Sequence, residues 1–115
     1  MLHTALRETK EEVGLRFRPD EIVGHLDAVN TYTSNFSVVP FVTLPKHIPH
    51  PQEFTTEVEC IINVPLQATL ETCQPDFEHS RTSKHDMYRY LYKGVIIWGV
   101  TARILKQFDI CLRAE

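Results

Sequence analysis

A short amphipathic pattern at the start of the chain, closed by a glycine, constrains the fold more than any other feature. Apolar or small side chains recur at helical spacing from Leu2 to Val13. Gly14 follows at once, and glycine readily adopts the left-handed conformation in which helices commonly end. The pattern predicts an amphipathic helix over Leu2–Val13 that packs one face against the segments after it.

Segments of strand composition follow this helix. Ile22–Val29 and Phe36–Leu44 are rich in β-branched and aromatic residues, and turn-forming residues separate them. We therefore expect two neighbouring strands. The stretch PKHIPHPQ contains three prolines in eight residues, which excludes regular structure there, and a further strand is expected over Glu57–Val64.

The sequence of the second half of the chain predicts four further segments. They are a short helix at Leu66–Glu71, a polar loop from Cys73 to about Asp86, a hairpin of Tyr88–Tyr92 and Val95–Trp98 around Lys93-Gly94, and a helix at Thr101–Leu112. In that helix we expect Ala102, Ile104, Leu105 and Phe108 to face inward, with Trp98 and Ile104 in the core. The order of elements predicts a mixed α/β (α+β) layered fold.

Composition limits the number of domains and the classes of partner. With 115 residues and 43% hydrophobic content, we expect one domain over residues 1–115. A net charge of −3 gives no sign of a strongly basic nucleic-acid surface, and no apolar run is long enough to span a bilayer. The three cysteines lack a CxxC pair and favour a reducing compartment. We expect a soluble, cytoplasmic protein whose partners are small molecules or other proteins.

Three glutamates crowd one part of the first helix. Glu8, Glu11 and Glu12 lie at i, i+3 and i+4, so they share a face, and like charges at this spacing repel one another. One interpretation is a solvated face, because Arg7 and Lys10 are close in sequence. The other is a site for Mg²⁺ or Mn²⁺, since hard cations prefer carboxylate oxygens and offset their repulsion.

The segment RETKEEVGL, Arg7 to Leu15, resembles the second half of the Nudix box, R-E-U-x-E-E-x-G-U with U apolar. Thr9 stands where an apolar residue is typical. The resemblance implies a Nudix fold, an α/β/α sandwich with a mixed sheet, and hydrolysis of a nucleoside diphosphate linked to another moiety. It also implies Glu8 and Glu12 as principal metal ligands, Glu11 as a further ligand or a water-mediated contact, and Arg7 as an orienting ion-pair partner.

Other segments resemble the coenzyme A diphosphatase branch of this family. They are SVVPFV from Ser37, EVECIINVPL from Glu57 and IIWGVTARIL from Ile96. The resemblance implies coenzyme A or an acyl derivative as substrate, with 3′,5′-ADP and 4′-phosphopantetheine as products. The first half of the box would lie upstream of Arg7, so we expect a truncated Nudix domain, with the box helix at the N-terminus, or a chain that completes its sheet from a partner such as a second copy.

Several further residues are candidates for roles in this reaction. Glu11 and Glu57 are candidate general bases, although Glu57 could equally be a charge at a strand edge. Arg81, Lys84, His85 and Arg89 could bind the 3′-phosphate of coenzyme A or form a solvated loop. Tyr88, Tyr90 and Tyr92 alternate, so they could stack on adenine or form one face of a sheet.

Two other functions stay open at this point. The box does not encode the substrate, so ADP-ribose or a dinucleotide is an alternative to coenzyme A. A catalytically inactive, Nudix-derived module that binds a nucleotide or a protein through an exposed sheet edge is an alternative to the enzyme.

Overall fold

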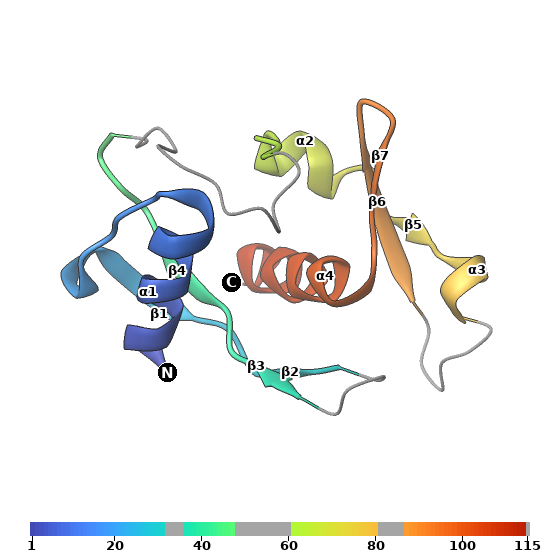
Figure 1. Ribbon diagram of the computed structural model, residues 1–115. Helices are drawn as coiled ribbons and strands as arrows, with labels where there is room; N and C mark the ends of the chain where they lie inside the picture. The colour runs from blue at the N-terminus through green and yellow to red at the C-terminus, as the bar shows by residue number, and fades with distance from the viewer. Residues whose placement is uncertain (32–35, 48–60, 81–86, 115) are drawn as a thin grey trace. The chain divides into compact units, whose positions relative to one another are not determined.

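The computed structural model describes residues 1–31, 36–47, 61–80 and 87–114. The chain forms two compact units (Figure 1). Unit 1 comprises Met1–His25 and Val39–Asn63, and unit 2 comprises Leu26–Val38 and Val64–Glu115. Helices stand near both ends of the described chain, and the strands between them are all paired antiparallel, so the expected α+β class is confirmed.

Unit 1 contains the first helix and one strand pair. Helix α1 spans Leu2–Val13, as the sequence predicts, and ends at Gly14, whose φ of 70° and ψ of 20° are left-handed. A short 3₁₀ helix, η1 (Pro19–Glu21), leads into β1 (Ile22–His25), which pairs antiparallel with β4 (Phe41–Thr43). Side chains of α1, β1 and β4 line an open cavity of about 260 Å³, and no residue of α1 is fully buried.

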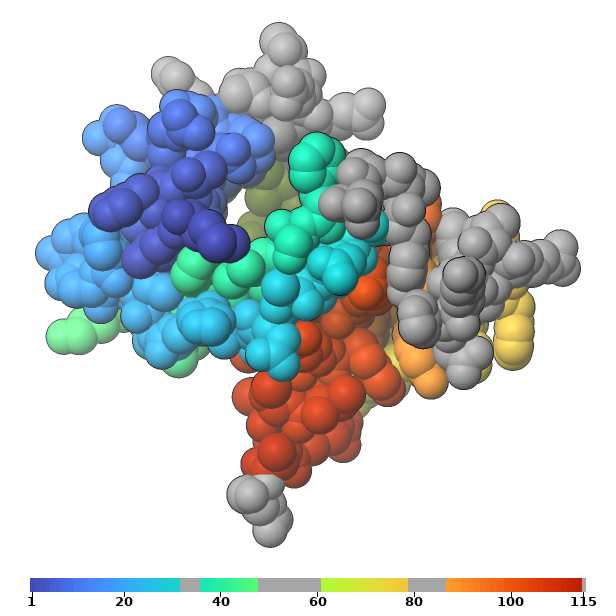
Figure 2. Space-filling model, turned by 90° about the horizontal axis from the view of Figure 1, so that it is seen from below, coloured from blue at the N-terminus to red at the C-terminus, as the bar shows by residue number. Residues whose placement is uncertain are grey.

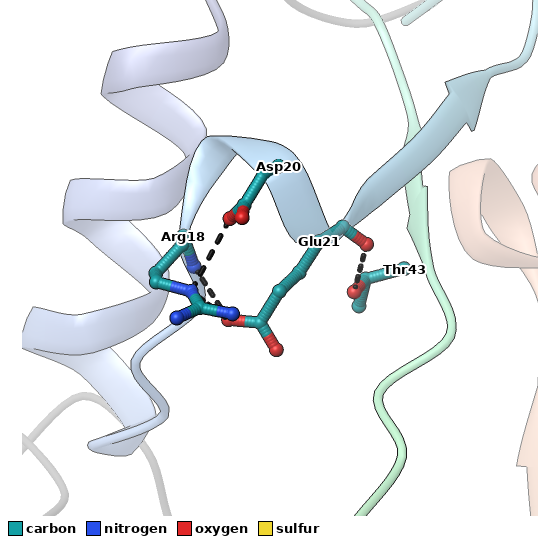
Figure 3. A network of polar contacts seen from close by, with 4 residues as sticks. All are labelled: Arg18, Asp20, Glu21 and Thr43. Atoms are coloured by element: carbon teal, nitrogen blue, oxygen red, sulfur yellow. Dashed lines mark hydrogen bonds and ion pairs between the residues drawn. The ribbon is translucent and has the colours of Figure 1, made fainter.

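A polar network fixes the entry into β1 (Figure 3). The Glu21 carboxylate accepts a hydrogen bond of 2.9 Å from the Arg18 backbone N–H, which caps η1. The Arg18 guanidinium lies 3.2 Å from Asp20 and 3.5 Å from Glu21. The Thr43 hydroxyl donates a 2.7 Å hydrogen bond to the Glu21 carbonyl, so β4 is tied to the start of β1.

Unit 2 is built around the C-terminal helix. Its elements are β2 (Val29–Asn30), β3 (Ser37–Val38), α2 (Leu66–Leu70), β5 (Gln74–Pro75), α3 (Phe77–Ser80), β6 (Tyr88–Tyr92), β7 (Val95–Ile97) and α4 (Gly99–Arg113). Strand β6 lies between β5 and β7, and α4 packs against β6 and α2 (Figure 1). The buried cluster of Leu70, Tyr90 and Ala102 joins these elements.

The hairpin turn lies where the sequence predicts, and α4 is longer than the predicted Thr101–Leu112 by two residues at its start and one at its end. The β6–β7 turn at Lys93-Gly94 has positive φ at both residues, 44° and 81°, which suits a tight hairpin. Helix α4 carries Ala102 fully inward and Leu105 against the core cluster. Its last turns are open to solvent, and residues 110–114 are exposed on the surface drawn in red in Figure 2.

The strands are shorter than expected. The two segments predicted as continuous strands pair with each other, but each is divided, giving β1 with β4 and β2 with β3. Pro40 has no N–H to donate and interrupts the second segment. Within the described ranges the strands therefore form three small antiparallel sheets in place of one mixed sheet.

Three other expectations need correction or lie outside the described residues. Residues 57–60 of the strand expected at Glu57–Val64 are not described, and Ile61–Val64 is not a strand. The loop expected from Cys73 contains β5 and α3, because Gln74 and Pro75 pair with β6. Trp98 was expected in the core but is 53% exposed, since it stands at the N-cap of α4 in extended conformation. Ile104 is half-buried.

Candidate active site

Helix α1 presents the candidate catalytic residues on its exposed side. Its apolar side, with Leu2, Ala5 and Leu6, faces the cavity shared with β1 and β4. The remaining side therefore points to solvent, and Arg7, Glu8, Glu11 and Glu12 are all exposed. Helical geometry places Glu8 and Glu12 one turn apart on this side. The helix thus offers two carboxylates at a spacing that a single cation can bridge.

The charged side chains on the exposed side of α1 interact only weakly with one another. Arg7 Nη2 lies 4.0 Å from Glu8 Oε1, with both side chains more than half exposed, 63% and 54%. An ion pair at this distance in solvent contributes little to stability. Glu8 is consequently free to exchange the guanidinium for another cation.

The fit to a divalent metal is partial. Carboxylate oxygens have the donor chemistry that Mg²⁺ and Mn²⁺ prefer. However, within the described part of the chain no group of three or more His, Cys, Asp or Glu side chains converges closely enough to hold a metal ion. The Glu8–Glu12 pair supplies part of a ligand set, and Glu11 does not complete it.

The other candidate residues are distributed elsewhere. Glu57, Arg81, Lys84 and His85 lie outside the described residues. Arg89 and Tyr90 are neighbours on β6 in unit 2. Arg89 donates from Nε and Nη2 to Gln74 Oε1, at 3.2 and 3.1 Å, which fixes its guanidinium across the β5–β6 pair.

Tyr90 is part of the core of unit 2. Its side chain is wholly buried against Leu70 and Ala102, so in this structure the ring has no surface on which a base could stack. Burial raises the pKa of its phenol, and the neighbouring Cys73 adds to that rise. Of the three alternating tyrosines, Tyr90 thus packs on helices, as one of the two interpretations of this pattern expects, whereas Tyr88 and Tyr92 are half-buried.

A group of polar side chains around Cys73 was not found from the sequence. Thr72 Oγ1 donates to the Thr69 carbonyl at 2.6 Å and accepts from the Leu91 N–H at 2.8 Å. Lys106 Nζ lies 3.9 Å from Cys73 Sγ. These partners are 19 and 33 residues apart in sequence, so no local pattern points to them.

Comparison with curated proteins finds relatives named "Uncharacterized Nudix hydrolase NudL". Those of Salmonella newport and Salmonella enteritidis PT4 are each 30% identical to the chain over 113 residues. The matched region covers 96% of this chain and 58% of each relative, so the chain spans little more than half the length of these proteins. No protein-family model and no solved structure matches the chain. The chain is thus similar, along nearly all of its own length, to proteins named Nudix hydrolases.

The described helices are all unsuited to cross a membrane. Even α4, which spans 15 residues, is shorter than a bilayer requires.

Proposed function

We propose that the chain is part of a metal-dependent Nudix diphosphatase that hydrolyses coenzyme A or acyl-CoA to 3′,5′-ADP and 4′-phosphopantetheine or its acyl form. The observation that carries the proposal is the exposed face of α1, where Glu8, Glu11 and Glu12 follow Arg7 and precede the left-handed Gly14. The relation to proteins named Nudix hydrolases supports the same reaction class. Both units would then belong to one partial Nudix domain.

In this proposal Glu8 and Glu12 would hold the Mg²⁺ or Mn²⁺ ion, and Glu11 would be a further ligand or would contact the ion through water. When bound, the metal neutralises diphosphate charge and activates water. Arg7 orients Glu8, to which it is adjacent at 4.0 Å. Glu11 or Glu57 acts as general base by accepting the proton of the attacking water.

In this proposal, basic residues of unit 2 bind the substrate. Arg89, with Arg81 and Lys84, would bind the 3′-phosphate by charge-assisted hydrogen bonds. Hydrogen bonds to Gln74 already orient the Arg89 guanidinium. Tyr90, because it is buried, would act as a positioning residue that anchors the strand carrying Arg89.

The test is phosphorus NMR of the purified chain with coenzyme A and Mg²⁺ or Mn²⁺. We expect 3′,5′-ADP and phosphopantetheine to appear with the unaltered chain and to be lost in Glu12→Gln. Glu78→Gln removes an exposed carboxylate in unit 2 and should retain turnover, so it is the matched control. An unchanged coenzyme A spectrum with hydrolysis of ADP-ribose would favour the alternative substrate.

The absence of a third converging ligand in the described residues favours a second candidate, an inactive Nudix-derived binding module. Such a module would bind coenzyme A without hydrolysing it. Isothermal titration with coenzyme A, beside the NMR assay, distinguishes the two, because binding without products supports only the module.

We also propose a cellular location and an oligomeric state for the protein. We infer a cytoplasmic protein, because Cys73 and Cys111 form no disulfide within the residues that the structure describes. A homodimer would let a second chain pair with an open strand edge. Light scattering of the purified chain would give a mass of two copies if this pairing occurs, and of one copy if it does not.

A further inference from the structure

Cys73 occupies an unusual position between a cation and a buried phenol. It follows α2, is half-buried, and packs against the cluster of Leu70, Tyr90 and Ala102. Lys106 of α4 places its Nζ atom 3.9 Å from Cys73 Sγ. A neighbouring ammonium stabilises a thiolate relative to a thiol, and the thiolate is the reactive form of cysteine.

The Lys106 side chain is held in this position from its other side. Its Nζ lies over the Tyr88 ring, 4.5 Å from the ring centroid, which is cation–π geometry. Asp109 lies about one turn further along α4. Its Oδ1 is engaged by Arg113 Nε at 2.8 Å, so Asp109 has a partner of its own.

The Tyr90 hydroxyl supplies a second, independent observation. It is fully buried, and in the described part of the chain Oη makes no hydrogen bond of ordinary geometry. Both burial and the adjacent Cys73 raise the pKa of this phenol, so it stays a protonated donor beside the thiol. A buried donor without an acceptor is unfavourable, and an oxygen atom bonded to Cys73 Sγ would provide one.

We propose that Cys73 is a site of oxidation by hydrogen peroxide, forming a sulfenic acid whose oxygen is held between Lys106 and Tyr90. The thiolate sulfur attacks one peroxide oxygen, the S–O bond forms and the O–O bond breaks. Sulfur loses two electrons to the peroxide, and the departing hydroxide takes a proton to become water. Cys73 is half-buried, so part of the residue stays in contact with the solvent that carries peroxide.

The test compares two cysteines in the same molecule. Cys111, near the end of α4, is exposed, so by accessibility alone it should react faster than Cys73. Cys60 is replaced by serine, because no Lys or Arg separates it from Cys73 and trypsin would leave both on one peptide. The reduced chain is treated with hydrogen peroxide in the presence of dimedone, and labelling of each cysteine is followed by mass spectrometry.

We expect Cys73 to label faster than Cys111. Lys106→Met should slow Cys73 by about threefold or more, because it removes the ammonium that lies 3.9 Å from Sγ. Lys106→Arg keeps that charge and should keep the rate, and Lys10→Met, in unit 1, should have no effect. Tyr90→Phe should shorten the lifetime of the sulfenic acid with no change at Cys111.

Faster labelling of Cys111 than of Cys73 in the unaltered chain would overturn the proposal. So would equal Cys73 rates in Lys106→Met and Lys106→Arg, both shown to be folded by circular dichroism. If Lys106→Met does not fold, the comparison between the two cysteines and the Tyr90→Phe lifetime decide the question.

Discussion

The Gly14 N–H donates a 3.0 Å hydrogen bond to the Lys10 carbonyl and closes α1 with Gly14 in the left-handed conformation. The helix therefore ends at Val13, one residue after Glu12. Glu11 and Glu12 belong to the sequence pattern that suggests a metal site. Gly14, which belongs to the same pattern, therefore ends the helix close to these candidate metal ligands.

Gly14→Ala should destabilise unit 1 by about 1 kcal/mol, because a β-carbon is disfavoured at a φ of 70°. Urea unfolding followed by circular dichroism measures this change. Gly24→Ala is the matched control: it lies in β1, where an added β-carbon meets no atom within 4 Å, and should change the free energy of unfolding little. Equal effects at both positions would contradict the role given to Gly14.

Thr72→Val should destabilise the chain by about 2 kcal/mol. The hydroxyl makes two hydrogen bonds, and its removal leaves the Leu91 N–H without that partner. Thr72→Ser keeps the oxygen and should recover most of the stability. Chemical denaturation of both variants tests the expectation, which fails if serine is as unstable as valine.

Mg²⁺ or Mn²⁺ should stabilise the chain if Glu8 and Glu12 form a ligand pair. A metal at one hundred times its dissociation constant adds about 2.7 kcal/mol to the free energy of unfolding. Glu12→Gln should leave metal-free stability within about 0.5 kcal/mol, because the side chain is exposed, and should abolish the gain from metal. Thermal melts with and without metal, with Glu78→Gln as control, measure both effects.

The free energy of unfolding should fall in alkaline solution because of the Tyr90 phenol. Its folded-state pKa is raised above the ordinary value of 10.0, mainly by burial, so above pH 10.0 the unfolded state releases the phenolic proton while the folded state keeps it. The contribution is fully present below pH 10.0 and is lost as pH rises further. Tyr90→Phe should have a shallower loss of stability with pH than Tyr92→Phe, as measured by urea unfolding across this range. The same slope in both variants would exclude Tyr90 as the source.

Local patterns were sufficient where neighbouring residues decide the structure. The boundaries of α1 follow from apolar spacing and Gly14, and the β6–β7 hairpin follows from Lys93-Gly94. The candidate catalytic face of α1 was equally predictable, since helical spacing alone puts Glu8 and Glu12 on one side.

Tertiary contacts decided what the sequence pattern left open. The short strand β5 exists because Gln74 and Pro75 meet Arg89 and Tyr88, and no local periodicity encodes such a pairing. Likewise Trp98 is apolar but exposed, because the start of α4 turns it away from the core.

The sequence by itself determined the helices at the two ends, the hairpin and the resemblance to a Nudix hydrolase, because spacing and turn chemistry act over a few residues. Only the tertiary structure decided that Tyr90 is buried and that Lys106 lies beside Cys73. Those placements depend on which elements pack together, and packing is set by contacts between residues far apart in the chain.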